Sequence, residues 1–488
     1  MKQKRASTTE KIAKKRRRRA ARPYRIVSVL CVLLFVSLAV YLSYFQIVKS
    51  DELLNSPYNK RTEKLAEKVV RGSILASDGT ALAYTEVGED DSENRIYPYS
   101  SLFAHTVGYL DYGSSGLELS ENSTLLTSHQ DLSSQVSSDI KNQKKTGDNV
   151  VTTFNISLQQ AASDALGDNQ GAVFVMDVDT GDVLVDVSKP GFDPNTIVSD
   201  WESLTSEENE SSGVFVNRAT QGLYPPGSTF KVVTALAYLR EYGTFDNFTF
   251  NCTGTYENSG YTIHCAGNTS HGEENFAQAM ANSCNCAFAS MAVEKIDKSV
   301  LRDTAEDLKF NEKFSLDIPS SESKFTLDKD SADQLTMQTG IGQGDTVATP
   351  MEMCMIADAV ANGGKMMSPR FITRVENTTG DIVKSRSVKS VGNVMSQTES
   401  EQLTVLMKAV VSDGTASTLS ELPYDIAGKT GTAQYGDVSE GKAHSWFIGF
   451  SNTGGEDIAL CVLIEDGGNG NAPAVEAAKK IFQSYFGG

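Results

Sequence analysis

The segment Pro225-Pro226-Gly227-Ser228-Thr229-Phe230-Lys231 sets a serine hydroxyl and a lysine amine three residues apart. Residues i and i+3 of a helix share one face, with Cβ atoms about 5 to 6 Å apart, so the amine can reach the hydroxyl. The apolar residues 232–237 predict a buried helix, and burial lowers the pKa of a lysine toward neutrality. We therefore take Ser228 as the candidate nucleophile and Lys231 as the base that accepts its proton.

Two further motifs lie downstream, Ser283-Cys284-Asn285 and Lys429-Thr430-Gly431-Thr432. A Ser-x-x-Lys spacing alone is weak evidence, because a capping serine followed by a solvated lysine gives the same pattern. The three motifs in this order, however, are the signature of the penicillin-recognising acyl-serine transferases. The chain resembles that family.

The resemblance extends over about residues 55–486. Residues 339–344 (TGIGQG) resemble the Gly-Gln segment of the family, and residues 413–416 (DGTA) fit the stretch before its Lys-Thr-Gly motif. Arg71-Gly72-Ser73-Ile74 resembles the entry to the extracytoplasmic part of class B penicillin-binding proteins. The resemblance therefore implies a monofunctional class B enzyme.

The N-terminus combines a basic tail with an uncharged stretch. Residues 1–25 hold twelve Lys or Arg and one acidic residue, whereas the whole chain has a net charge of −18. Residues 26–48 carry no charge over 23 positions, and a helix of that length spans roughly 34 Å, enough to cross a hydrocarbon core of about 30 Å. We predict an uncleaved anchor in the cell membrane, single-pass, with a cytoplasmic N-terminus and an extracytoplasmic catalytic domain. A cleaved signal peptide is the competing interpretation.

The seven cysteines are too few and too scattered for a disulfide scaffold. Cys252 and Cys265 bracket a loop rich in Gly, Thr and Asn, and either a disulfide or two free thiols would fit. A zinc site using them with His264 or His271 is a weaker alternative, because no paired Cys-x-x-Cys is present. We predict no metal and no cofactor, and we expect Cys284 to be a buried thiol without a chemical role.

The order of predicted elements indicates an α+β fold. Residues 158–166 have helical spacing ending at Gly167, and residues 171–178 and 183–187 form a hairpin pattern. The middle of the chain is mostly helical, with a capping box predicted at residues 349–352. Three strands and a last helix then follow at residues 424–434, 445–450, 458–464 and 473–486.

Together these patterns divide the chain into four predicted regions. They are a basic cytoplasmic tail at residues 1–25, a transmembrane helix at 26–48, an extracytoplasmic pedestal at 49–154 and a transpeptidase domain at 155–488. The pedestal is polar and predicted to be β-rich, and by the resemblance it is too short for a glycosyltransferase module. The resemblance implies that the transpeptidase domain has an antiparallel five-stranded sheet flanked by helices, plus a helical subdomain.

The resemblance also assigns chemistry to the motifs. Ser228 attacks the penultimate D-alanine of a peptidoglycan stem peptide ending in D-Ala-D-Ala and releases the terminal D-alanine. The resulting acyl-enzyme is then attacked by the amine of a second stem. Lys231 takes the proton of Ser228, Ser283 passes a proton to the departing amine, and Asn285 orients the substrate amide.

The third motif is expected on an edge strand that pairs with the stem peptide. Gly431 has no side chain to obstruct that pairing. Lys429 keeps the pocket positive, and with the hydroxyls of Thr430 and Thr432 it attracts the terminal carboxylate. The backbone N–H groups of Ser228 and Thr432 are the expected oxyanion hole.

Partners and rival functions follow from the same resemblance. It implies acylation by beta-lactam antibiotics and pairing with a SEDS-type glycan polymerase in the membrane, and the apolar stretch after the basic tail argues against nucleic acid. The alternatives are a serine beta-lactamase, a penicillin-binding sensor and a non-catalytic scaffold for a glycan polymerase. A Ser-His-Asp triad is disfavoured, because Ser228 lacks a Gly-x-Ser-x-Gly surround.

Overall fold

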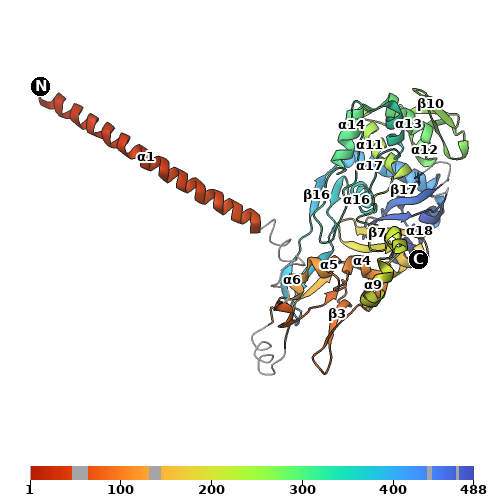
Figure 1. Ribbon diagram of the computed structural model, residues 1–488. Coiled ribbons are helices and arrows are strands. Elements are labelled where there is room, and N and C mark those ends of the chain that lie inside the picture. The colour runs from red at the N-terminus through yellow and green to blue at the C-terminus, as the bar shows by residue number, and fades with distance from the viewer. Residues whose placement is uncertain (1, 47–63, 131–143, 437–441, 469–471, 488) are drawn as a thin grey trace. The chain divides into compact units, whose positions relative to one another are not determined.

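The computed structural model describes residues 2–46, 64–130, 144–436, 442–468 and 472–487. These residues belong to two units, divided between residues 63 and 64. Figure 1 shows the long helix α1 of the first unit and the mixed helices and strands of the second.

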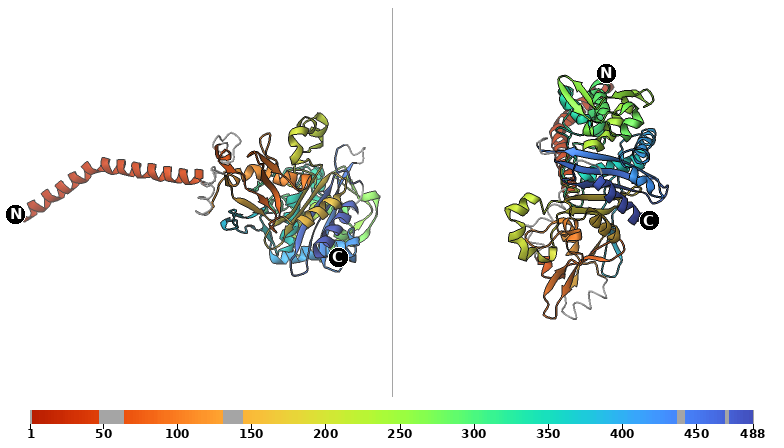
Figure 2. Two further views of the ribbon diagram at one scale, coloured as in Figure 1. Left: turned by 90° about the horizontal axis from the view of Figure 1, so that it is seen from below. Right: turned by 90° about the vertical axis from the view of Figure 1, so that its right-hand side faces the viewer.

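Helix α1 is one continuous helix over Lys2–Tyr44. Its stretch Glu10–Tyr44 is long and apolar enough to cross a membrane. The basic tail, expected to precede the helix, is part of it, because Lys, Arg and Ala favour helix. Pro23 lies inside α1 and removes one backbone hydrogen bond, and the helix bends along its length (Figure 2). Residues 47 and 48 of the predicted span lie outside the described residues.

The second unit contains the predicted five-stranded sheet, with strand order β17-β18-β19-β7-β8 and every pair antiparallel. The strands are β7 (Gly171–Asp177), β8 (Val183–Lys189), β17 (Ile426–Gln434), β18 (Ala443–Ser451) and β19 (Ile458–Ile464). Strands from the two ends of the catalytic region therefore meet, and β17, which carries the third motif, is an edge strand.

Helices cover this sheet. Helices α8 (Ile156–Leu166) and α18 (Ala472–Phe486) pack together and contact the sheet, as do α16 (Pro350–Ala361) and α17 (Gln397–Ser412). Every residue of β18 and β19 is buried, which requires cover on both faces and agrees with the unbroken apolar run of β19. The predicted helices at 158–166 and 473–486 and the strand pattern are thus confirmed.

The predicted capping box at α16 is only half present. The Thr349 hydroxyl accepts from the Glu352 N–H at 3.1 Å, but the Thr349 N–H donates to Ser323 Oγ at 3.1 Å. Because that N–H is already engaged, the Glu352 carboxylate does not bond back to it. Glu352 is instead fully buried with neither carboxylate oxygen hydrogen bonded.

A second, six-stranded sheet has the order β15-β14-β6-β2-β3-β4. Its strands are β2 (Ile74–Leu75), β3 (Ala81–Val87), β4 (Glu93–Ile96), β6 (Asn149–Thr152), β14 (Ile372–Glu376) and β15 (Ile382–Ser385). The predicted domain boundaries put residues 372–385 in the transpeptidase domain. In the structure, the strands β14 and β15 of this stretch belong to the pedestal sheet, with Val375 opposite Val150. The pedestal is therefore not built from residues 49–154 alone, and the four domain boundaries stay a prediction.

The central region is mostly helical, as expected, and supplies the first two motifs. Its elements are the 3-10 turn η4 (Gly227–Phe230), α11 (Lys231–Tyr242), α12 (Phe276–Ala281), α13 (Asn285–Glu294), α14 (Lys298–Asp307) and α15 (Asp333–Gly340). Two small sheets interrupt it, formed by β9 (Thr249–Cys252) with β12 (Gly272–Asn275) and by β10 (Thr255–Asn258) with β11 (Tyr261–His264).

The remaining elements are short. In the pedestal they are β1 (Val69–Val70), η2 (Ser100–Phe103), α4 (Ala104–Val107), α5 (Gly116–Ser120), α6 (Asn122–Leu125) and β5 (Lys145–Thr146). Elsewhere they are η3 (Pro194–Thr196), α9 (Ile197–Leu204), α10 (Glu207–Ser212), η5 (Ala266–Asn268), β13 (Lys365–Met367), β16 (Ser390–Asn393) and η6 (Ser417–Glu421).

Candidate active site

Ser228 lies in the turn η4, directly before helix α11, as the motif predicted. The turn begins at Gly227, which has a φ of +53° and donates its N–H to Gly342 O at 2.9 Å. A Cβ at Gly227 would stand 2.8 Å from Thr432 O, so only glycine lets the turn lie this close to β17. The Ser228 side chain is half-buried, and its hydroxyl has no hydrogen-bond partner among the described residues.

Lys231, one turn further along, is fully buried. Its amine donates to Ser283 O at 2.7 Å, to Asn285 Oδ1 at 2.7 Å and to Ser283 Oγ at 3.2 Å. Burial lowers the pKa of Lys231 to about 8, although charge on the neighbouring cysteine sulfurs acts in the opposite direction. Burial therefore moves this pKa toward neutrality, as a base would need, and the hydrogen bonds of the amine join the first motif to the second. The role of Lys231 as the base stays a prediction.

Ser283 receives hydrogen bonds from two lysines. Lys429, also fully buried, donates to Ser283 Oγ at 2.9 Å and to Thr430 O at 2.9 Å. Burial, followed by the charge of Lys231, holds the pKa of Lys429 well below its ordinary value. Because Ser283 Oγ accepts from both amines, its own proton is available to a third group. Ser283 has a φ of +54°, an uncommon conformation for a non-glycine residue.

The Lys429–Thr432 stretch lies on the edge strand β17, as predicted. The Thr430 hydroxyl is fully buried and hydrogen bonded to Thr415, whereas Thr432 is half-exposed. Thr432 is thus better placed than Thr430 to meet a ligand.

Gly431 packs closely against the turn that carries Ser228. A Cβ there would stand 3.0 Å from Thr229 Cγ2 and 3.2 Å from both Pro226 O and Trp446 Cβ. The absence of a side chain at Gly431 therefore leaves room for the Ser228 turn. Its expected role in pairing with a stem peptide stays a prediction.

The structure thus brings Lys231, Ser283, Asn285 and Lys429 into one hydrogen-bonded network next to the Ser228 turn. Sequence reasoning did not assign Thr415 or His264, although both support the site. The Asn285 amide donates to His264 O at 2.9 Å, and residues 413–416 were recognised only as a family motif. Such contacts depend on segments that the sequence does not mark as neighbours.

No histidine side chain among the described residues hydrogen bonds to this network. His444, on β18, stacks on Tyr435 with ring centroids 4.2 Å apart, and its Nδ1 is buried without a hydrogen bond. Among the described residues no carboxylate is hydrogen bonded to His444, so a Ser-His-Asp triad using this histidine would lack its acidic member.

Comparison with known proteins identifies two matching families and several relatives. The penicillin binding protein transpeptidase domain family matches residues 171–483, and the penicillin binding protein A dimerisation domain family matches residues 71–150. The peptidoglycan D,D-transpeptidase PbpA of Mycobacterium tuberculosis is 31% identical over 95% of this chain and 99% of its own length.

Two solved structures are similar in fold. The D,D-transpeptidase domain of a peptidoglycan glycosyltransferase from Eggerthella lenta has a TM-score of 0.77 at 29% identity, covering 86% of this chain and 99% of its own. Penicillin-binding protein A from M. tuberculosis, as its penicillin G acyl-enzyme complex, has a TM-score of 0.75 at 27% identity, covering 86% and 100%. The chain therefore belongs to the penicillin-binding protein transpeptidase family, with the α+β fold of its class B members.

Proposed function

We propose that this protein is a membrane-anchored peptidoglycan D,D-transpeptidase that works through an acyl-enzyme on Ser228. The observation that carries the proposal is the buried network in which Lys231 and Lys429 both donate to Ser283 beside the Ser228 turn. A serine hydroxyl needs a neighbouring base to become a nucleophile, and Lys231, with a pKa of about 8, is such a base. The activity named for the relative PbpA supports the substrate class.

In the acylation half, the Ser228 oxygen bonds to the carbonyl carbon of the penultimate D-alanine while its proton passes to Lys231. The bond to the terminal D-alanine then breaks. Ser283 gives its proton to the departing amine, and it regains one from Lys231, to which it is already hydrogen bonded. In the second half, the amine of another stem peptide attacks the ester and the proton path runs in reverse.

Substrate binding is assigned to the edge strand and the second motif. The free edge of β17 offers main-chain groups to an extended stem peptide. The Thr432 hydroxyl and the positive charge of Lys429 attract the terminal carboxylate of the stem peptide, and Asn285 orients its amide. Backbone N–H groups of Ser228 and Thr432 stabilise the oxyanion, an effect typically worth about 10²- to 10³-fold in rate.

The location and partners belong to the same proposal. The span Glu10–Tyr44 anchors the protein in the cell membrane, and the excess of Lys and Arg in residues 1–25 favours a cytoplasmic N-terminus. The catalytic unit then lies outside the membrane, where a SEDS-type glycan polymerase supplies the strands to be cross-linked. Beta-lactams acylate Ser228 in place of the stem peptide.

Labelling of the purified full-length protein with a fluorescent penicillin tests the proposal. We expect one stable covalent label per chain and none on Ser228→Ala, with Ser417→Ala, outside the motifs, as the matched control. Incubation with D-Ala-D-Ala stem peptides and an acceptor amine should release D-alanine and form the cross-linked product. Rapid loss of the label would indicate a beta-lactamase. A stable label without D-alanine release would indicate a sensor, and no label a scaffold.

A further inference from the structure

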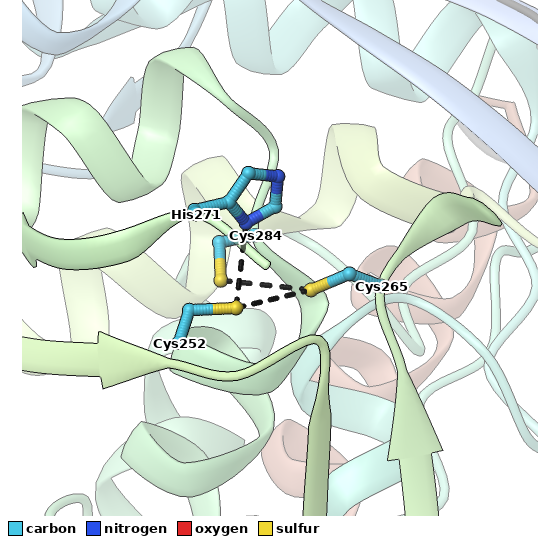
Figure 3. A group of neighbouring side chains, drawn as sticks. All are labelled: Cys252, Cys265, His271 and Cys284. Atoms are coloured by element: carbon cyan, nitrogen blue, oxygen red, sulfur yellow. Dashed lines mark hydrogen bonds between the residues drawn. The ribbon is translucent and has the colours of Figure 1, made fainter. Parts of the chain in front are cut away.

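Four side chains with metal-binding atoms converge in the central region, from segments that are separate in sequence. Cys252 ends β9, Cys265 follows β11, His271 precedes β12, and Cys284 caps helix α13. The three sulfurs and a ring nitrogen all lie within 4.8 Å of one another. Figure 3 shows the sulfur atoms of the cysteines pointing toward a common centre, with the imidazole ring beside them.

The spacing of these atoms suits a tetrahedral zinc site. Cys252 Sγ lies 3.6 Å from Cys265 Sγ and 3.4 Å from His271 Nδ1, and Cys265 Sγ lies 3.7 Å from Cys284 Sγ. Sulfur ligands at about 2.3 Å from a tetrahedral Zn²⁺ stand about 3.8 Å apart, close to these values. A disulfide needs about 2.05 Å between two sulfurs and would leave the third thiol and the imidazole unused.

A buried carboxylate beside the cluster gives a second, independent indication of a cation. Glu274 is 1% exposed, and its Oε2 has no hydrogen-bond partner although it lies 3.8 Å from His271 Nδ1. Its other oxygen accepts from Asn282 at 2.8 Å. Burial of an uncompensated carboxylate is costly, and a divalent cation in the cluster would supply the missing charge.

The backbone around the sulfurs is also arranged as in thiolate sites. Gly254 N–H donates to Cys252 Sγ at 3.4 Å, and Ala287 N–H donates to Cys284 Sγ at 3.4 Å. Such hydrogen bonds stabilise the thiolate form that a metal requires. Three thiolates and an imidazole are soft or intermediate ligands, which favour zinc over magnesium or calcium.

The cluster is joined directly to the candidate active site. Cys284 is the middle residue of the second motif, between Ser283 and Asn285. On the other side, Cys265 follows His264, whose carbonyl accepts from the Asn285 amide at 2.9 Å. An ion that binds both cysteines would therefore fix the loop that presents Ser283 and Asn285 to Lys231.

We propose that Cys252, Cys265, His271 and Cys284 bind one Zn²⁺ ion, and that this ion holds the Ser283–Asn285 loop in its position against Lys231. All four positions are occupied by protein ligands, so the ion is structural and takes no part in the chemical steps. The inference replaces the sequence-based expectation of a metal-free protein. The metal site itself does not depend on the proposed function, whereas the effect on acylation does.

Metal content is the first test. The full-length protein, purified in detergent under reducing, oxygen-free conditions, should retain one zinc per chain after dialysis against a weak chelator. Substitution by Co²⁺ should give the intense visible bands of tetrahedral thiolate coordination.

Cys252→Ser and His271→Ala should each lower the zinc content to well below half. Cys286→Ser is the matched control, since Cys286 Sγ lies 3.4 Å from Cys265 Sγ but outside the proposed ligand set. Unchanged zinc content in Cys252→Ser, or no zinc in the parent protein, would overturn the proposal. A Cys252–Cys265 disulfide in a second preparation, purified without reductant, would overturn it as well.

Penicillin labelling then tests the effect of the ion on the loop. Removal of zinc with a strong chelator from the unmutated protein, which avoids a folding defect by mutation, should slow acylation by tenfold or more, and added Zn²⁺ should restore it. Acylation at the original rate by the zinc-free protein would refute the positioning role of the ion. It would leave the zinc site itself unaffected. If the zinc-loaded protein were not labelled at all, the proposed function would fail instead, independently of the zinc stoichiometry.

Discussion

Asn285→Asp should slow acylation by shifting the protonation of Lys231. Asn285 Oδ1 accepts from the Lys231 amine at 2.7 Å, so the aspartate places a negative charge against it with almost no change of shape. A unit charge at about 4 Å is worth roughly 4 kcal/mol at an effective dielectric constant near 20. One pKa unit corresponds to about 1.4 kcal/mol, so we expect the pKa of Lys231 to rise by about 1 to 3 units.

The size of the effect follows from the neutral fraction of the amine. At a pKa of about 8, about a tenth of Lys231 is neutral at pH 7 and about nine tenths at pH 9. The parent protein should therefore be acylated faster as the pH rises, with a midpoint near 8. In Asn285→Asp the rate at pH 7 should fall about 10- to 1000-fold, and the deficit should be about five- to tenfold smaller at pH 9.

The assay is the initial rate of labelling by a fluorescent penicillin at several pH values from 6.5 to 9.5, with short exposures. Asn285→Ala is the matched control, because it loses the hydrogen bonds to Lys231 and His264 without adding a charge. Its deficit should not shrink as the pH rises. A midpoint in Asn285→Asp equal to that of the parent would show that Lys231 is not the base.

Three further predictions concern packing and buried charge. Gly431→Ala should lower the free energy of unfolding by about 1 to 3 kcal/mol through overpacking against the Ser228 turn, and it should slow penicillin labelling. Thermal unfolding measures the first effect and the labelling rate the second. An unchanged labelling rate would contradict the assigned packing. Glu118→Gln leaves Arg71 and Arg95, which bond its carboxylate at 2.6 and 2.8 Å, without a buried counter-charge. We expect a loss of about 3 to 5 kcal/mol in denaturant unfolding, and a loss below 1 kcal/mol would count against the ion group. Burial raises the pKa of Glu352 from 4.5 to about 8, so the folded chain holds a proton between these pH values that the unfolded chain releases, and stability falls as the pH rises through that window. Glu352→Gln should remove this slope and be more stable than the parent at pH 8 by a few kcal/mol, with the difference shrinking toward pH 4.5; parallel stability curves would disprove it.

The individual strands and the Ser228 and Lys231 spacing could be predicted from local signals, whereas the antiparallel five-stranded sheet and the meeting of the three motifs were implied by the family resemblance. The apolar runs of β18 and β19 mark buried strands, and the Ser228 and Lys231 spacing marks one helix face. The thiol cluster left a weaker signal, since its four residues fall within a short stretch but without the usual Cys-x-x-Cys spacing. The catalytic roles of Ser228, Lys231, Ser283, Asn285 and Lys429 stay predictions.

Other features depend on contacts between distant segments and could not be predicted. Val375 lies opposite Val150, although nothing in either stretch specifies the other. The packing of Gly431 against Thr229 and the burial of Thr430 by Thr415 likewise arise only when separate elements meet. The missing half of the capping box at α16 has the same cause, because Ser323 takes the N–H that the local pattern reserved for Glu352.

The pedestal sheet is formed by strands from two separate stretches of the sequence, so the pedestal and the catalytic stretch cannot be separated without breaking it. Strand β14 hydrogen bonds with β6, and β6 with β2, so the catalytic stretch of sequence contributes two of the six strands. A chain shortened to residues 155–488 would lack β6, the neighbour of β14. The backbone groups along that side of β14 would then be exposed and could pair with other molecules. Conversely, a force applied to β2 or β6 reaches β14, and with it the catalytic stretch, through hydrogen-bonded backbone.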